Sequence, residues 1–281
     1  GGRGVKAAEL REGDYVEHVL HTSAHQNLLF FTNTGRVHRI KAHQIPVQSR
    51  TGKGVIAQGV LPLEADERIQ AVIDTKDFSE AEFIVMVTKG GQAKKTPFGD
   101  YDTPRQSVIA ISLKDGDELV AVRPTNGDND LLIFSKAGQG IRFAETDLRP
   151  MGRDTQGVRG MKLRDGDEVM AAGSSADTNE IVLITSGGYG KRTLLEHFRV
   201  QGRGGIGVKA IKLTRVRGHL VGARAITLDD ELFVMNSTGI GIRIAVKSIS
   251  RQQREATGVR IMSLEDGSEL VAFTVVGSDD E

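Results

Sequence analysis

One Gly-Val step recurs along the whole chain at an almost constant interval, and this period constrains the fold more than any other feature. Its valines are Val5, Val55, Val108, Val158, Val208 and Val259, spaced 50 to 53 residues apart, with serine in place of glycine before Val108. A second pattern runs in phase: an apolar tetrad, a polar turn with glycine, and a basic residue four positions after that glycine. Its five copies begin at Leu28, Ile84, Leu131, Ile181 and Leu232. The chain is therefore an array of repeats of about fifty residues.

The residues inside each repeat favour strands over helices. A repeat offers a short stretch after the Gly-Val step, a run such as Glu-Leu-Val-Ala at 118–121, the apolar tetrad, and the basic stretch after the turn. Short apolar runs bounded by Thr, Asn, Ser and Gly suit buried strands, and no window keeps a helical apolar stripe for three turns. Turns such as 33–35 and 186–188 supply residues that tight hairpins need. Each repeat is predicted to be a blade of four short strands.

Blades of this kind solve the edge problem of antiparallel sheets when they are arranged radially, as in propellers. No Pro/Ser-rich linker or charge run interrupts the period, so residues 1–281 are predicted to form one all-β, propeller-like domain. The Gly-Val step occurs six times, once as Ser-Val, and the tetrad five times. We therefore expect six blades, the first truncated at the N-terminus, with the chain beginning inside a repeat.

The composition narrows the compartment and the class of partner. Cysteine is absent, which excludes disulfides and thiolate metal sites and fits a reducing cytoplasm. No signal peptide or long apolar run is present, so no membrane association is expected. Lys plus Arg equals Asp plus Glu at 37 each, and net charge alone gives no support to nucleic-acid binding. Acidic residues gather in Asp-Gly-Asp-Glu turns such as 115–118, whereas basic residues follow the tetrad turns, so one face is expected to be positive.

Three motifs that could carry other chemistry have simpler explanations. Gly202, Gly204 and Gly207 match a dinucleotide fingerprint, but that fingerprint opens a helix and residues 208–213 alternate like a strand. His18, His21 and His25 are close in sequence, yet the odd spacing of the first two puts them on opposite faces of a strand. Asp128 to Asp130 lacks the glutamate that completes a calcium loop. We expect no catalytic residue, no metal and no cofactor in this chain.

The basic residues after the tetrad turns are the candidate functional residues of the repeats. They share one phase in five repeats and are often doubled, which favours a function over the alternative that they only keep exposed strands soluble. The set comprises Arg36, Arg39, Lys94, Lys95, Arg142, Lys191, Arg192 and Arg243.

The chain resembles the C-terminal DNA-wrapping domain of the bacterial DNA gyrase A subunit, a six-bladed β-pinwheel. The family's hallmark is a box of Gln-Arg-Arg-Gly-Gly-Lys-Gly, and Gly1 to Gly4 is similar to its end, with Arg3 at the lysine position. Residues 201–207 are similar to the additional box of actinobacterial gyrases, with glycine at 202 and isoleucine at 206 in place of two cations. The box positions that match are Gln201, Arg203, Gly204, Gly205 and Gly207. The flanks 148–153 and 189–193 carry the same resemblance.

This resemblance implies a non-catalytic module that binds duplex DNA without sequence preference and wraps it for negative supercoiling. The box residues, with Arg3, would contact DNA beside the turn-following cations. Mg²⁺ and ATP would belong to the holoenzyme, whose partners would be the gyrase B subunit and a second A subunit in an A2B2 assembly; the isolated domain would be monomeric. Two alternatives stay open: a topoisomerase IV C-terminal domain, and a protein-binding propeller, although propellers of that kind usually carry Trp or Tyr in each blade and this chain has no Trp and three Tyr.

Overall fold

The computed structural model describes residues 26–45 and 60–277 of the 281-residue chain. Within these ranges the regular structure consists of β-strands and one-turn 3-10 helices, with no α-helix. The strands form five antiparallel sheets, four of four strands and one of three. The all-β prediction is confirmed, and the five sheets correspond to the five tetrads. The predicted truncated repeat, with Arg3, His18, His21 and His25, lies outside the described residues.

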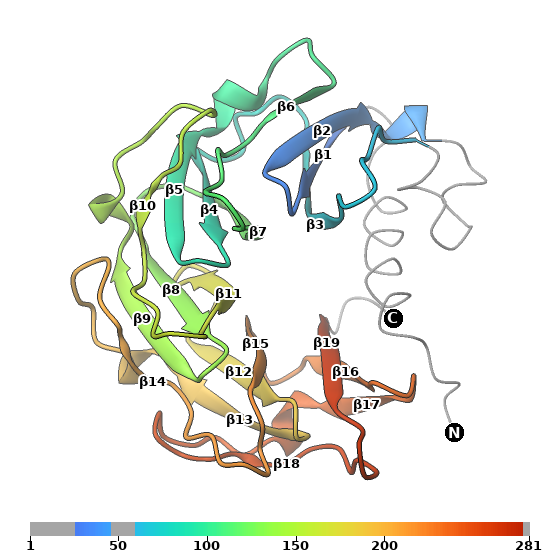
Figure 1. Cartoon of the computed structure of the whole chain (residues 1–281), viewed down its shortest axis with the longest axis vertical. Helices are drawn as coiled ribbons and strands as arrows, with labels where there is room; N and C mark the ends of the chain where they lie inside the picture. The colour runs from blue at the N-terminus through green and yellow to red at the C-terminus, as the bar shows by residue number, and fades with distance from the viewer. Residues whose placement is uncertain (1–25, 46–59, 278–281) are drawn as a thin grey trace. The chain divides into compact units, whose positions relative to one another are not determined.

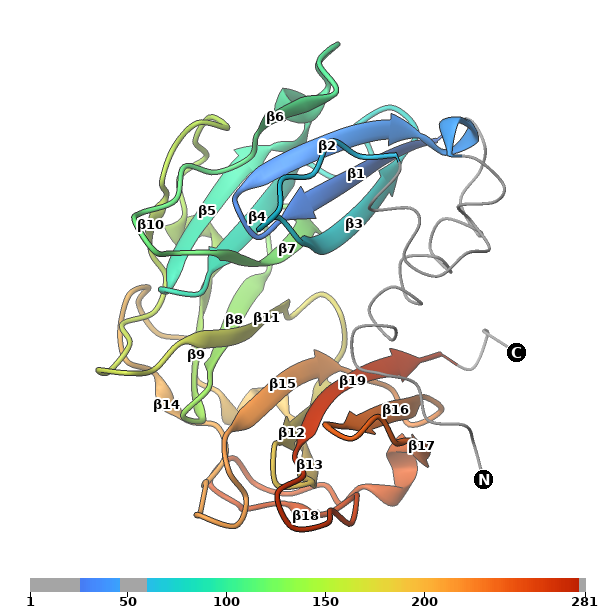
Figure 2. The ribbon, with the colours of Figure 1, turned by 45° about the vertical axis from the view of Figure 1, so that its right-hand side comes forward.

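Each four-stranded sheet is built from two successive repeats. In the first, the tetrad strand β1 (Asn27–Thr32) pairs with β2 (Arg36–Lys41) on one side and β3 (Ile69–Thr75) on the other. The fourth strand, β6 (Ser107–Ile109), comes from the next repeat and contains its Gly-Val position. Figures 1 and 2 show β1 and β2 in blue with β3 beside them in blue-green. The Gly-Val strand of each repeat thus completes the blade before it.

The tetrad strands lie in the middle of their sheets, which explains their unbroken apolar runs. All six residues of β1 are buried, as are all six of β12 (Glu180–Thr185). A strand covered on both faces has no polar side to expose, so it shows no alternation. The other tetrad strands are β4 (Phe83–Thr88), β8 (Asp130–Ser135) and β16 (Glu231–Asn236).

The remaining elements follow the same order in every repeat. The basic strands after the hairpin turns are β5 (Gln92–Pro97), β9 (Gln139–Ala144), β13 (Tyr189–Leu194) and β17 (Gly241–Ala245). The 3-10 turns that end the basic strands are η1 (Ala42–Gln44), η2 (Phe98–Tyr101), η3 (Glu145–Asp147), η4 (Leu195–His197) and η5 (Val246–Ser248). The Gly-Val strands are β10 (Val158–Arg159), β14 (Val208–Lys209) and β18 (Val259–Arg260), and the last strands are β7 (Leu119–Thr125), β11 (Val169–Ser174), β15 (Leu220–Ala225) and β19 (Leu270–Val276).

The hairpin glycine joins one repeat to the next. Gly188 has a φ of +86°, and its carbonyl accepts hydrogen bonds from the amides of Ile261 (2.8 Å) and Met262 (3.2 Å). A β-carbon on Gly188 would lie 2.4 Å from the Met262 oxygen, so no side chain fits there. The in-phase glycine of the sequence pattern therefore has a structural cause.

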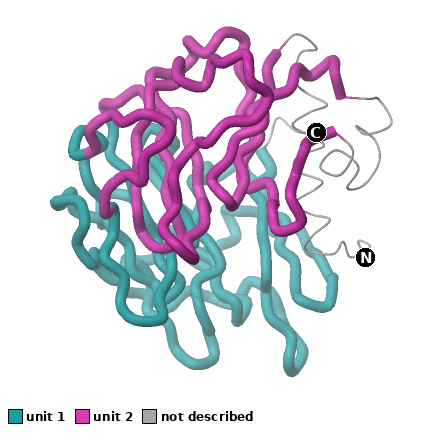
Figure 3. The backbone as a smooth tube through the Cα atoms, turned by 45° about the horizontal axis from the view of Figure 1, so that its top comes forward, with its two compact units in different colours: residues 1–7, 129–147, 160–281 teal, residues 8–128, 148–159 magenta. Residues whose placement is uncertain are grey.

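The described residues divide into two compact units (Figure 3). One holds 26–45, 60–128 and 148–159 and contains two sheets, β3-β1-β2-β6 and β10-β5-β4-β7. The other holds 129–147 and 160–277 and contains three sheets, β11-β8-β9-β14, β15-β12-β13-β18 and β17-β16-β19. Each unit has apolar cores between neighbouring blades, such as the one around Phe134 and Phe198, whose rings meet edge to face at 5.7 Å. The single-domain prediction stays a prediction.

Candidate nucleic-acid interface

Two of the predicted DNA-contacting lysines are buried inside their units. Lys94 is 1% exposed, and its amine donates hydrogen bonds to the carbonyl oxygens of Ala110, Gly152 and Arg153. Lys191 is fully buried, and its amine donates to the carbonyl oxygens of Gln253 and Arg254. Burial, which disfavours the charged amine, lowers the pKa of Lys94 to about 8 and that of Lys191 to about 7.

The cation four positions after each hairpin glycine has a partner inside its own blade. In every described repeat that partner is the residue just before the tetrad, because the two residues lie on adjacent antiparallel strands. Arg192 bonds the Glu180 carboxylate at 2.7 Å and the Ile249 carbonyl at 2.7 Å. The equivalent pairs are Arg39 with Asn27, Lys95 over the ring of Phe83, Arg142 with Asp130, and Arg243 with Glu231.

Lys94, Lys95, Lys191 and Arg192 are all buried, so the expected positive face does not include these four side chains. The physical reason is that the loop of the next repeat covers the basic strand. In that loop the amides of Met151, Gln201 and Gln252 donate to the carbonyls of Lys95, Arg142 and Arg192, respectively. The outer edge of each of these basic strands is thus paired with the main chain of the covering loop and is not left open.

Other members of the predicted set keep some exposure. Arg39 and Arg142 are half-buried and engaged by carboxylate and carbonyl oxygens, and Arg36 lies within 3.4 Å of Glu64 and Glu67. The Arg243 side chain is 57% exposed beside Glu231. A DNA contact by any of them stays a prediction.

The box residues 201–207 form the loop that covers β9. The Gln201 amide donates to Arg142, Gly204 donates to the Gly160 carbonyl, and the Gly205 carbonyl accepts from Lys162. The Arg203 side chain is exposed, whereas the amide nitrogen of the Gln201 side chain is buried without an acceptor among residues 26–45 and 60–277. Gly204 and Gly207 have positive φ values of 87° and 79°. The structure thus brings Gln201, Arg203, Gly204, Gly205 and Gly207 into one loop, while Arg3 lies outside the described part.

A different set of cations occupies the outside of these loops. We call them the loop cations: they stand nine and five residues before the Gly-Val valine and one residue after it. All are exposed or half-buried. The set is Arg149, Arg153 and Arg159 in the unit with two sheets, and Arg199, Arg203, Lys209, Arg254 and Arg260 in the unit with three.

Only Arg203 of this set was predicted as a site residue. The others could have been found by counting from each valine, because Arg153, Arg203 and Arg254 all lie five residues before Val158, Val208 and Val259. Counting from the hairpin glycine, as was done for the predicted set, leads instead to cations on the strands that these loops cover.

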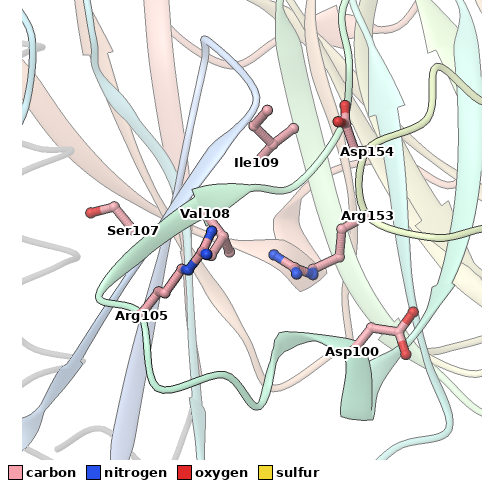
Figure 4. Close-up of a pocket in the computed structure, with 7 residues that line it drawn as sticks. All are labelled: Asp100, Arg105, Ser107, Val108, Ile109, Arg153 and Asp154. Carbon is pink, nitrogen blue, oxygen red and sulfur yellow. The ribbon is translucent and has the colours of Figure 1, made fainter.

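A polar pocket of about 630 Å³ lies beside the loop of the two-sheet unit. Arg105 and Arg153 extend toward one another across it from different segments (Figure 4). Within the described residues neither guanidinium has a hydrogen bond or ion pair, whereas Asp154, on the pocket wall, is hydrogen-bonded by the Ser112 hydroxyl. Two guanidinium groups at one polar hollow suit a phosphate group.

The acidic turns support the hairpins of their own blades. A carboxylate oxygen of Asp117 accepts from the Gly90 amide at 2.8 Å, and one of Asp167 accepts from the Ala137 amide at 2.9 Å. These carboxylates are thereby held at the hairpin ends.

No group of His, Asp and Glu able to hold a metal ion occurs in the part of the chain that the structure describes. In the same residues no helix has the length and apolar character needed to cross a membrane.

Comparison with known proteins identifies the family. The family model described as "DNA gyrase C-terminal domain, beta-propeller" matches six segments, residues 1–23, 26–76, 82–126, 129–175, 179–227 and 230–276. The last five coincide with the five repeats seen in the structure, and the short first segment agrees with the predicted incomplete repeat.

Whole-chain relatives are DNA gyrase A subunits. Identity is 47% to that of Clostridium acetobutylicum, 48% to that of Halalkalibacterium halodurans and 41% to that of Mycolicibacterium smegmatis, each over all of this chain and 34% of the relative. The chain therefore spans about a third of the length of these curated relatives. The sequence similarity is therefore not restricted to actinobacterial gyrase A subunits, to which residues 201–207 were compared above.

Solved structures give the same fold. A topoisomerase IV C-terminal domain superposes with a TM-score of 0.85 at 26% identity, covering 92% of this chain and 81% of that one. A DNA gyrase A C-terminal domain superposes with a TM-score of 0.76 at 25% identity, covering 90% and 83%. The in-phase blades, the exchanged Gly-Val strands and the family match lead to one assignment: the chain belongs to the β-propeller family of DNA gyrase C-terminal domains.

Proposed function

We propose that this chain binds duplex DNA without sequence preference through the loop cations, and bends it as part of DNA gyrase. The observation that carries the proposal is the recurrence of exposed or half-buried cations at equivalent positions of successive loops, in both units. Phosphates recur regularly along a duplex, so a repeating array of cations matches them without reading bases.

The free-energy cost of bending DNA explains why many protein–phosphate contacts, spread over several blades, would be needed. Curving 20–30 base pairs by 40–90° costs on the order of 1–6 kcal/mol, which a few isolated ion pairs at a surface do not offset. Repetition of the loop before Val158, Val208 and Val259 would spread the contacts over three successive repeats.

In the whole protein this module would present the bent DNA segment for negative supercoiling. Strand passage and Mg²⁺-dependent ATP hydrolysis would belong to other parts of an A2B2 assembly that includes the gyrase B subunit. The protein would act in the bacterial cytoplasm, at the nucleoid. The chain itself contributes binding and bending.

The test is a binding titration with two duplexes of unrelated sequence. We expect equal affinities for both and a steep fall between about 50 and 200 mM salt, as counterion release requires. An affinity that does not change with salt, or that differs strongly between the duplexes, would refute phosphate-based binding.

A topoisomerase IV role is the second candidate, favoured by the TM-score of 0.85 to such a domain. The box at 201–207 and the gyrase A names of relatives at 41–48% identity favour gyrase. A topoisomer assay of the full-length enzyme separates the two: gyrase activity introduces negative supercoils into relaxed plasmid, and an enzyme that only relaxes them supports the second candidate.

A further inference from the structure

We infer that Lys94 and Lys191 are positioning residues for DNA binding: each fixes the main chain at one loop cation, Arg153 or Arg254, whose guanidinium meets the duplex backbone. This inference rests on the proposed duplex binding. The two lysines are too deeply buried to touch a phosphate themselves, so they would act by positioning the neighbouring arginines.

The Lys94 amine is matched to its acceptors. It donates to the carbonyl oxygens of Ala110 at 2.6 Å, Gly152 at 3.2 Å and Arg153 at 2.6 Å. An ammonium group has three donors, so this site uses all of them on main-chain oxygens. One of these bonds holds the carbonyl of Arg153 itself and thereby sets where the Arg153 side chain leaves the main chain toward the pocket.

Lys191 repeats the arrangement in the other unit. Its amine donates to the carbonyl oxygens of Gln253 at 2.7 Å and Arg254 at 2.6 Å. Gly152 and Gln253 both stand six residues before the Gly-Val valine, and Arg153 and Arg254 both stand five residues before it. The same two carbonyls are therefore held in two independent copies, and one of them always belongs to the arginine.

The blade between these copies shows that packing alone does not require a lysine here. Ile141 occupies the equivalent position on β9 and is completely buried. The loop above it is the glycine box, which is held by main-chain bonds instead, from the Gly204 amide to the Gly160 carbonyl and from the Lys162 amide to the Gly205 carbonyl. An aliphatic side chain fills the core, so the amines of Lys94 and Lys191 serve the loops that lack the box.

A double-mutant cycle on DNA affinity tests this role, with the full chain and a labelled duplex at fixed low salt. Lys94→Met should weaken binding by about three- to tenfold in the parent, as expected for one misplaced charged contact. In the Arg153→Ala background the same change should have almost no further effect. In the Arg254→Ala background, whose arginine is in the other unit, Lys94→Met should keep its full effect.

Circular dichroism and thermal unfolding establish that each variant is folded at the assay temperature. If Lys94→Met does not fold, the reciprocal cycle of Lys191→Met with Arg254→Ala, with Arg153→Ala as the control background, gives the same test. Equal losses in all backgrounds would show that the lysine acts only on general stability, and unchanged affinity would show that it does not act on binding; either result overturns the inference. Failure of the proposed function appears separately, as absence of salt-dependent binding by the parent, and it removes the inference as well.

Discussion

Replacing Gly207 by alanine should destabilise the protein, whereas the same change at Gly205 should be nearly neutral, although both glycines belong to the box. Gly207 has a φ of +79°, and a β-carbon there would lie 2.3 Å from the Gly140 oxygen. Gly205 does not have a left-handed φ, and the nearest atom to its added β-carbon would be the Gln201 side-chain oxygen at 3.7 Å.

The magnitude at Gly207 has two parts. The left-handed conformation costs an alanine roughly 1–2 kcal/mol, and relieving the overlap with Gly140 costs about 1–3 kcal/mol more. The expected loss in the free energy of unfolding is therefore about 2–5 kcal/mol. At Gly205 the alanine restricts the unfolded chain, which changes the free energy of unfolding by less than about 1 kcal/mol and in the stabilising direction.

Urea titration followed by circular dichroism measures both values, with equal m-values as the check that the unfolding reaction is unchanged. Gly202→Ala is the matched control, because its β-carbon would meet nothing within 4 Å. A Gly207→Ala protein as stable as the parent, or a Gly205→Ala protein as damaged as Gly207→Ala, would refute the reasoning. If Gly205→Ala keeps its stability and loses DNA affinity, that loss reports close approach of the duplex to the loop.

Two further predictions concern the buried charges. Glu180→Gln should lower the free energy of unfolding by about 3–5 kcal/mol in urea titrations, because it leaves Arg192 buried without its carboxylate. Glu231→Gln, the control at the exposed equivalent pair with Arg243, should lower it by less than about 1 kcal/mol. Similar losses for the two variants would contradict the role of burial. The free energy of unfolding should rise with pH from about 8 toward 9.5, because the pKa of Lys94, ordinarily 10.5, is lowered to about 8 in the fold, so the unfolded chain binds more protons in that window. Lys94→Met should reduce this slope by about 1 kcal/mol per pH unit, and equal slopes in parent and variant would show that burial does not depress the amine's pKa.

The repeat pattern predicted the blades well because strand order within a repeat depends on local sequence. The tetrads at Leu28 and Ile181 are unbroken apolar runs since β1 and β12 are central strands, and the in-phase glycine is fixed by the close contact between Gly188 and Met262. Exchange of the Gly-Val strand into the preceding blade was not predicted, because it pairs residues such as Val37 and Val108 that lie far apart in the chain.

The basic residues show why phase alone did not locate the candidate interface. Lys94 and Lys191 recur because each blade needs its next loop fastened, and a structural requirement repeats with the same period as a functional one. The acceptors that bury these amines come from residues about sixty positions later, such as Arg153 and Arg254. Only the three-dimensional contact separates a covered cation on a strand from an exposed one on a loop.

The salt dependence of duplex binding by loop variants tests the central claim most directly. The logarithm of the binding constant should fall linearly with the logarithm of salt concentration, and Arg153→Ala with Arg254→Ala should reduce the slope by about 2, close to 0.9 for each lost phosphate contact. The charge-matched control is Lys114→Ala with Arg164→Ala, two exposed cations beside the acidic turns, and its slope should equal that of the parent. An unchanged slope in the loop variant, or an equal reduction in the control, would contradict binding through the loop cations.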